Sequence, residues 1–579
     1  MPSKRISIAA ANGKAQMAID FARDDRVVNL RRIQAALAGD QALLVLVSLF
    51  LVIVVAYPIL SSLRALDTHE LWVLLSRSDL LAIRNTAVAT LLMLPPSLAI
   101  AVPMAWLCSR TNMPGRSAIV ALVGMSYMMP VLFTTIAYVF LFGKNAGLLN
   151  VAFRNVFGVP LYDIYSFSGV VFVSVLQCFP LIFFTTASGL NKMNPELEES
   201  ARVVGLKPLQ VFFKITLSAI LPSILAGVAF AIATSITMLA APLILAVPIG
   251  IPFITTEVYA AIVMFPNITR GVALSIPLVL MTVIALWFQS RLIRGQSSRY
   301  VTVGGKGARS DRIDLHRWRV PAALLCMACV FFSVILPFLS LLYYGLMNYS
   351  WKGFVPSNLT FKHFMTLFNS PTATGALINS VMLAVGTGVF LAIMGAVIAV
   401  VLGGEQTLLK RGLRALGMLP LGIAPIIGGV LVILAWYGSP FHLGATPWIL
   451  GLGYVLILLP YAIKACEVAR GQIDNSLPEA ARICGATSVS TWRHVLLPLM
   501  RNGVFTTFVI VFLFCIKEFP LTALVHSANT MTLAVQIYAY YEGGNFGPCG
   551  AGAVVLLVIT FGTLLLTGRI FNASMHGSR

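Results

Sequence analysis

The fold is decided by a polar stretch that occurs twice in the chain, as residues 195–205, PELEESARVVG, and as residues 475–485, NSLPEAARICG. The copies stand 280 residues apart, and Leu, Glu, Ala, Arg and Gly recur in them at equal offsets. The alignment extends upstream, where Pro180 matches Pro460. This repetition predicts two related halves in one chain, each carrying one copy of the stretch.

Most of the sequence around these stretches is apolar. Of the 579 residues, 58% are hydrophobic and 10% are Asp, Glu, Lys or Arg, whereas a soluble domain carries about 25% charged residues. We therefore expect an all-α integral membrane protein, since a helix needs about 20 apolar residues to cross a bilayer. About twelve transmembrane helices are predicted, near residues 42–63, 84–107, 117–142, 168–190, 220–246, 271–291, 320–346, 376–403, 415–437, 447–467, 502–523 and 547–570.

The basic residues indicate how the spans are oriented. Lys and Arg are concentrated in the N-terminal tail, in the break at 293–319 and near residues 410–414, whereas the loops 438–446 and 524–546 have none. Because positively charged loops stay in the cytoplasm, both termini are expected there. The net charge of +20 resides largely in such loops between apolar segments, so no nucleic-acid partner is expected.

Six spans in each half return the chain to the same side of the membrane, so the two six-helix repeats are expected to be parallel. The predicted organisation is a cytoplasmic N-terminal tail, a first transmembrane repeat, a cytoplasmic linker and a second transmembrane repeat, at residues 1–41, 42–292, 293–319 and 320–572.

Each polar stretch predicts a short helix, a turn at Gly205 or Gly485 and a second helix. Asn194 before the first stretch is a candidate N-cap, and Ser476 and Glu479 have the spacing of a capping box. A Glu precedes an Arg by three residues in both copies, Glu199 with Arg202 and Glu479 with Arg482.

An ordinary surface loop is the simpler interpretation of these stretches. It gives no reason for matching spacing in two halves that have otherwise diverged. We therefore expect the loops to transmit force between a partner protein and the spans.

The pattern resembles the EAA motif of permeases of ATP-binding-cassette importers, which reads Glu-Ala-Ala, three residues, Gly, nine residues and Ile-x-Leu-Pro. The residues that carry the repeat and the resemblance are Glu199, Ala201, Arg202 and Gly205, and Glu479, Ala480, Ala481, Arg482 and Gly485. The first copy departs from the motif with Ser200 for Ala and Ser218 for Pro, and the second with Val495 for Ile.

This resemblance implies a permease subunit and not an enzyme. In that family each loop is a coupling helix lodged in a separate subunit, so two copies of an ATP-binding-cassette ATPase are expected. A periplasmic or extracellular substrate-binding protein and a multi-pass location in the lipid bilayer of the bacterial cytoplasmic membrane are also implied. No cofactor, metal site or catalytic residue is expected in this chain.

The two-copy form narrows the resemblance to the fused permeases of ferric-iron, thiamine and 2-aminoethylphosphonate importers. Residues 517–524, KEFPLTAL, followed by residues 530–534, TMTLA, resemble the second half of the ferric-iron type. Ferric iron is therefore the first substrate expected, with 2-aminoethylphosphonate, thiamine or another small solute as alternatives.

Lys517 and Glu518 are the candidate pathway residues, because ionisable groups within apolar stretches are costly and usually face a cavity. The first half has the uncharged residues 238–241 in the corresponding region, with Pro242 matched to Pro520. A substrate contact, an outer gate, a structural pairing with another helix and a position nearer the outer interface all remain open. Glu518 also leaves an ion-coupled secondary transporter as an alternative, which would need coupling carboxylates near the midplane.

Overall fold

A computed structural model describes residues 41–65, 77–194, 196–297, 313–349, 356–404, 407–438, 440–474 and 476–576. Helices and short turns account for these ranges, apart from isolated bridges between Thr111 and Ile313 and between Met347 and Leu359. The all-α prediction is confirmed. Residues 1–40 of the predicted tail and 298–312 of the predicted linker lie outside the described residues.

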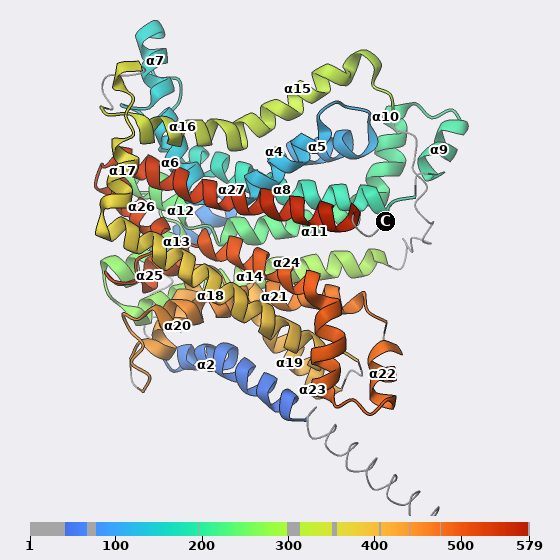
Figure 1. Cartoon of the computed structure of the whole chain (residues 1–579). Helices are drawn as coiled ribbons and strands as arrows, with labels where there is room; N and C mark the ends of the chain where they lie inside the picture. The colour runs from blue at the N-terminus through green and yellow to red at the C-terminus, as the bar shows by residue number, and fades with distance from the viewer. Residues whose placement is uncertain are drawn as a thin grey trace, which may run out of the picture. The chain divides into compact units, whose positions relative to one another are not determined.

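The helices of the two halves follow a similar order, except that α7 has no counterpart among the described residues of the second half (Figure 1). After the first span Gln41–Arg64, which includes α2 (Tyr57–Arg64), the first half contains α4 (Arg77–Arg110), α5 (Arg116–Met128), α6 (Val131–Phe142), α7 (Leu148–Phe157), α8 (Phe167–Lys192), α9 (Glu196–Val203), α10 (Pro208–Val211), α11 (Leu217–Ile236), α12 (Ala240–Leu245), α13 (Ile254–Tyr259) and α14 (Ile268–Ser297). The second half contains α15 (Arg319–Val330), α16 (Leu336–Leu346), α17 (Lys362–Asn369), α18 (Pro371–Val401), α19 (Leu408–Met418), α20 (Pro425–Val432), α21 (Pro447–Gly471), α22 (Ser476–Ile483), α23 (Ser488–Thr491), α24 (Leu497–Ile516), α25 (Pro520–Val525), α26 (Leu533–Glu542) and α27 (Phe546–His576).

Within the described ranges, ten helices are long and apolar enough to cross a membrane, or up to 13 if each of three bent helix pairs counts as one span. This agrees with the expected number of about twelve. The predicted spans 117–142 and 415–437 correspond to two of the bent pairs.

Proline explains why these two predicted spans are not single straight helices. α5 ends at Met128, and α6 begins after Pro130 at an angle of 98° to it. Ala424 similarly takes an extended conformation before Pro425 at the start of α20. A proline lacks the N–H that a continuing helix needs, and it keeps the preceding residue out of the helical region.

The predicted spans 220–246 and 502–523 are also interrupted. α11 ends at Ile236 and α24 at Ile516, and each is followed by three residues and a short helix, α12 or α25. Because both pairs stand 280 residues apart, Pro520 corresponds to Ala240. The sequence-based match of Pro520 with Pro242 was therefore wrong by two residues.

The chain forms two compact units that do not coincide with the sequence repeats. One comprises residues 41–57 together with Thr387–Leu419 and Leu458–Val511, and the other comprises Pro58–Gly386, Pro420–Ile457 and Phe512 onward. In the first unit, the ring of Phe50 lies 5.8 Å from that of Phe390. The first span of the first repeat thus packs against helices of the second repeat.

The reciprocal contact occurs within the other unit. The first span of the second repeat, α15 and α16, packs against α5 and α6 of the first repeat. The Tyr138 hydroxyl donates to the Phe332 carbonyl at 2.6 Å, and the Ser340 hydroxyl donates to the Ala137 carbonyl at 3.1 Å. The first span of each repeat thus contacts helices of the other repeat, and α16 packs in addition against α27 of its own repeat. The compact units therefore do not follow the predicted repeat boundaries.

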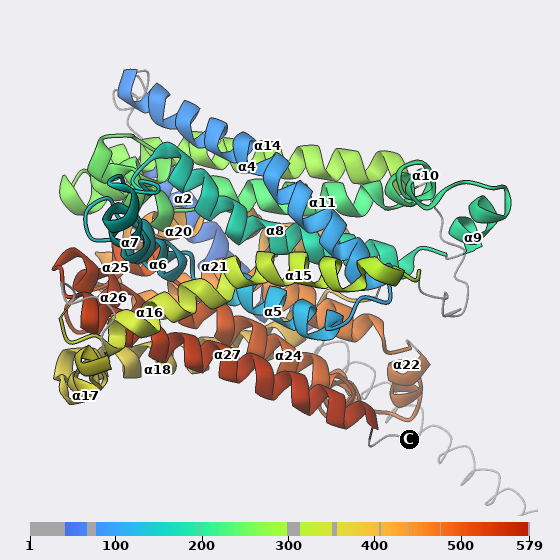
Figure 2. The same cartoon turned by 90° about the horizontal axis from the view of Figure 1, so that it is seen from above.

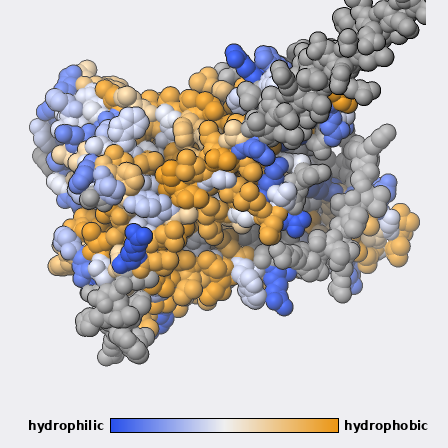
Figure 3. Space-filling view, turned by 90° about the horizontal axis from the view of Figure 1, so that it is seen from below, coloured by the Kyte–Doolittle hydropathy of each residue, from blue (hydrophilic) through white to orange (hydrophobic). Residues whose placement is uncertain are grey.

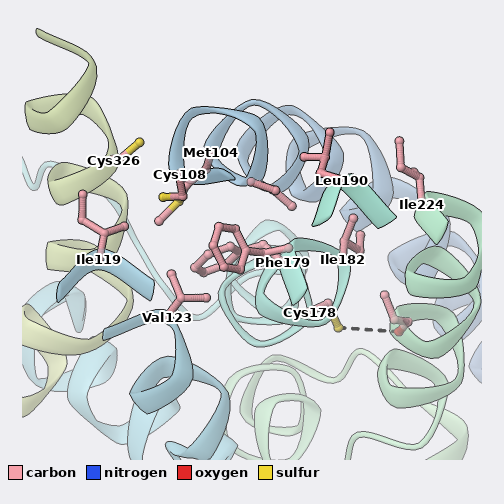
Figure 4. Packing of buried hydrophobic residues seen from close by; sticks show 14 of the residues in the cluster. Met104, Cys108, Ile119, Val123, Cys178, Phe179, Ile182, Leu190, Ile224 and Cys326 are labelled. Carbon is pink, nitrogen blue, oxygen red and sulfur yellow. Dashed lines mark hydrogen bonds between the residues drawn. The ribbon is translucent and has the colours of Figure 1, made fainter. Parts of the chain in front are cut away.

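A buried apolar cluster joins the helices that lead to the first polar loop. Phe179 of α8 is 1% exposed and lies among side chains from α4, α5 and α15 (Figure 4). The Cys178 thiol donates a hydrogen bond to the Ala231 carbonyl on α11 at 3.5 Å. This packing joins α4, α8 and α11, and the loop connects the end of α8 to the start of α11.

Hydrophobic side chains also cover much of the surface drawn in Figure 3. Leu91 of α4 and Ile284 of α14, for example, are 62% and 61% exposed. Apolar groups at such positions are stable in contact with lipid chains and not with water.

Candidate functional site

The first polar stretch folds as a short helix beyond the end of a span. α9 and α10 lie beyond the ends of α8 and α11, while α7 lies near the opposite end of α8 (Figures 1 and 2). Asn194 Oδ1 accepts the Glu196 N–H at 3.1 Å. The predicted N-cap is confirmed, and it satisfies an N–H that the helix start leaves without an intrahelical partner.

The turn after this helix has the predicted geometry in both loops. Gly205 has φ +90° and Gly485 has φ +84°, a region that residues with a Cβ avoid. The same backbone bond closes both turns, from the Leu206 N–H to the Ala201 carbonyl (3.2 Å) and from the Ala486 N–H to the Ala481 carbonyl (3.0 Å). The alanines of the repeat therefore supply the acceptors that end each helix.

The second loop begins with a different cap. Asp474 Oδ1 accepts the Ser476 N–H at 2.9 Å. Ser476, predicted from its spacing to Glu479 to be the cap, is instead the residue whose N–H is capped. The hydrogen bond from Ser476 favours the charged carboxylate and lowers the pKa of Asp474 below its usual value.

The residues predicted for coupling lie on the outer part of the two loops. Glu199, Gly205, Glu479, Ala480 and Gly485 are exposed, while Ala201 and Ala481 are partly buried. Arg202 and Arg482 lie within α9 and α22, but their side chains lie outside the described part of the structure. Their pairing with the glutamates therefore stays a prediction.

Both loops also expose apolar side chains at equivalent positions. Leu197 and Leu477 are 52% and 47% exposed, and Val203 and Ile483 are 88% and 87% exposed. Burying a side chain of this kind is favourable by about 1.5–3 kcal/mol, so each loop offers a surface that a partner could cover. The charged and small residues of the repeat predicted the coupling role, whereas these apolar positions were missed, although the alignment places an apolar residue at each of them in both copies.

A buried ion pair holds the first loop against the spans. Glu198 is 3% exposed, and its Oε2 lies 3.8 Å from Nε of Arg110 at the end of α4. The Thr216 hydroxyl donates to Glu198 Oε1 at 2.7 Å. Arg110 also donates to the carbonyls of Leu190 and Met193, at 2.9 and 3.3 Å. This network joins α4, α8 and α9. The repeat could not predict it, because Pro478 replaces Glu198 in the second copy.

An aromatic contact supports the helix that follows the turn. The ring of Phe212, seven residues after Gly205, packs edge-on at 5.5 Å from Trp106 of α4. Trp492 stands at the equivalent position of the second loop and is partly buried.

The two candidate pathway residues have different environments. Glu518 is 7% exposed, and its carboxylate accepts the N–H groups of Leu521 and Thr522 at 3.0 and 3.1 Å. The Thr522 hydroxyl donates to the same carboxylate at 2.8 Å and shares a hydrogen bond of 2.6 Å with the Tyr454 hydroxyl. Glu518 thus caps α25 and holds the break after α24.

Lys517 points to the first repeat instead. Its Nζ donates to the Tyr127 carbonyl at 3.1 Å and lies 5.0 Å from the Tyr127 ring and 4.9 Å from the Phe514 ring. The structure therefore separates Lys517 from Glu518, as expected for adjacent positions.

Comparison with known proteins matches both halves of the chain to the same family. A family model described as "Binding-protein-dependent transport system inner membrane component" matches residues 85–298 and 395–574, more than half of the chain. Each match contains one of the two polar loops.

Several curated relatives are similar to this chain. The ferric transport system permease protein FbpB of Actinobacillus pleuropneumoniae is 24% identical over 415 residues, which cover 69% of this chain and 58% of that protein. A putative 2-aminoethylphosphonate transport system permease protein PhnV of Salmonella typhimurium is 24% identical, covering 39% of this chain and 84% of the relative. The molybdenum transport system permease protein ModB of Mycobacterium bovis is 27% identical over a region that covers 35% of this chain and 81% of that protein.

The matched region thus spans less than two thirds of the length of the ferric relative. The long apolar helices make this chain a multi-pass membrane protein. Since the family model covers most of both repeats, the chain belongs to the family of binding-protein-dependent transport system inner membrane components.

Proposed function

We propose that this chain is the permease subunit of an ATP-binding-cassette importer and that a separate ATPase hydrolyses the ATP. One observation carries the proposal: apolar side chains are exposed to nearly equal extents at equivalent positions of the two loops, Leu197 with Leu477 and Val203 with Ile483. A short helix with an exposed apolar face fits a groove of a partner protein. Two such loops fit two ATPase subunits.

The proposed orientation places both loops and both termini in the cytoplasm. It is supported by the basic residues in the tail, in the 293–319 linker and near residues 410–414. A substrate-binding protein would then meet the opposite face, where the loop containing α7 lies.

Substitution of the exposed apolar residues tests this proposal. We expect the double variant Val203→Glu, Ile483→Glu to lower co-purification of the ATPase at least about tenfold, because two apolar contacts are replaced by charges without partners. The yield and membrane insertion of the chain should not change, because both side chains are almost fully exposed.

The matched control is Val156→Glu, a side chain that is 73% exposed on α7. This helix lies near the opposite end of α8 from the loops (Figure 1). This variant should bind the ATPase normally. Recovery of the ATPase with the double variant at the level of the unmodified chain would disprove the docking role of the loops.

Ferric iron is the first proposed substrate, supported by the KEFPLTAL stretch and by the ferric relative. The 2-aminoethylphosphonate and molybdenum relatives support a small oxyanion, and the resemblance to thiamine permeases leaves that vitamin as a further candidate. An ion-coupled secondary transporter is less well supported, because the carboxylate of Glu518 is already engaged in three hydrogen bonds at the start of α25.

A further inference from the structure

Lys517 lies where the two sequence repeats meet. It is the first residue after α24 of the second repeat, and its Nζ contacts the Tyr127 carbonyl of α5, in the first repeat. Tyr127, Phe514 and Lys517 are all partly exposed. A solute passing between the repeats could therefore reach the amino group.

The positive charge at this position has no carboxylate partner. Among the residues that the structure describes, no Asp or Glu oxygen lies within 4.0 Å of Lys517 Nζ. The neighbouring Glu518 is turned toward the backbone of α25. The Tyr127 carbonyl takes one of the three N–H donors of the ammonium group, and two are left to bind an acceptor.

The fold itself does not require a lysine here. The equivalent residue of the first repeat, 280 positions earlier, is Thr237, which follows α11 at the same kind of break. Its hydroxyl donates to the Ala233 and Thr234 carbonyls at 3.0 and 3.1 Å. The same break thus forms with an uncharged residue, and the charge of Lys517 is available for another role.

We infer that Lys517 selects the transported solute by binding an oxyanion, such as a phosphonate, a tetrahedral metal oxyanion or the carboxylate of a ferric chelate. A charged N–H donor that is held in place forms strong hydrogen bonds with such oxygens. The same charge repels a free ferric ion or the cationic vitamin thiamine. This inference rests on the proposed permease function and names the class of its substrate.

Uptake into proteoliposomes tests the inference, with the full chain reconstituted with its ATPase and binding protein. The labelled probes are 2-aminoethylphosphonate, molybdate, ferric citrate and thiamine. We expect uptake of at least one of the three oxyanion probes and none of thiamine. Transport of thiamine, or of none of the oxyanions, would overturn the inference.

Three variants isolate the charge. Lys517→Gln and Lys517→Thr should lower oxyanion uptake about tenfold or more. Threonine is the residue at the equivalent position of the first repeat, Thr237, so this variant should preserve the fold. Lys517→Arg should stay within about threefold of the unmodified chain because it keeps the positive charge. Lys464→Gln, at an exposed lysine, is the control that should not change uptake. Full uptake by the glutamine and threonine variants, or an equal loss in the arginine variant, contradicts a selecting charge.

ATPase co-purification on the same samples separates the two proposals. If all variants retain the ATPase and uptake is insensitive to the charge, only the role of Lys517 is wrong. If the unmodified chain binds no ATPase, the permease proposal fails and this inference fails with it.

Discussion

Glu198 and Glu199 are neighbours in the sequence but lie in opposite environments. Glu199 is exposed on α9, whereas Glu198 is buried beside Arg110 and Thr216. An exposed ion pair contributes at most about 1 kcal/mol, while removing one partner of a buried pair costs about 3–5 kcal/mol. Burial therefore decides that Glu198 holds the loop in place and that Glu199 remains accessible to a partner.

Alanine substitution should separate these two roles. We expect Glu198→Ala to destabilise the chain by about 3 kcal/mol, because Arg110 is left buried without its carboxylate. Glu199→Ala should leave the melting temperature in detergent unchanged while weakening ATPase binding. Equal melting temperatures for the two variants would show that the buried pair does not stabilise the loop.

The short helices α9 and α22 begin with chemically different caps. Asn194 caps α9 with an amide oxygen that does not titrate, and Asp474 caps α22 with a carboxylate. Because the Ser476 N–H lowers the pKa of Asp474 in the folded loop, that carboxylate stabilises α22 at pH values above its unfolded pKa, near 4. This contribution is lost as the pH falls through that value toward the lower folded pKa.

The two loops should therefore differ in their sensitivity to acid. Between about pH 5 and pH 3 we expect pepsin cleavage at residues 474–485 to rise relative to cleavage at residues 194–205. Taking the ratio of the two cleavage products removes the pH dependence of the protease itself. Asp474→Asn keeps an acceptor for the Ser476 N–H without a titrating group, so this variant should show a constant ratio. A constant ratio in the unmodified chain would rule out the cap as the cause.

At the scale of the whole molecule, each repeat packs its first span against helices of the other. Residues 41–57 belong to the compact unit that contains Thr387–Leu419, and α15 and α16 pack against α5 and α6. Each first span therefore loses part of its packing when the other repeat is absent, although α16 also packs against α27 of its own repeat. The covalent fusion of the repeats therefore keeps interdependent segments in one chain.

Expression of the two halves as separate chains tests this dependence. We expect residues 1–305 and 306–579 to co-purify when they are expressed together, because α16 retains its contacts with α6, including the Ser340 bond to Ala137. Either half expressed alone should give a markedly lower yield of monodisperse protein, since a buried face becomes exposed. Stable, monodisperse halves that do not associate would show that the exchanged spans are dispensable.

Local patterns in the sequence predicted much of this protein. The apolar runs gave the helices and the approximate number of spans, because burial in lipid depends on composition over about 20 residues. The repeated stretch gave the two loops, and Gly205 and Gly485 have the positive φ expected of them. Pro130 and Pro425, which stand at the breaks of two bent helix pairs, are the local signals that distinguish these pairs from straight spans.

The remaining features depend on contacts between residues that are far apart in the chain. Lys517 meets Tyr127 across 390 positions, and Arg110 meets Glu198 across 88. No local pattern encodes such pairs, because a side chain's partner is set by how the helices pack. The sequence by itself determined the membrane class, the duplication and the loops. Only the tertiary structure decided which charges cap helices, which hold the loops and, among the described residues, that Lys517 contacts Tyr127 and no carboxylate, because these partners are set by how the helices pack.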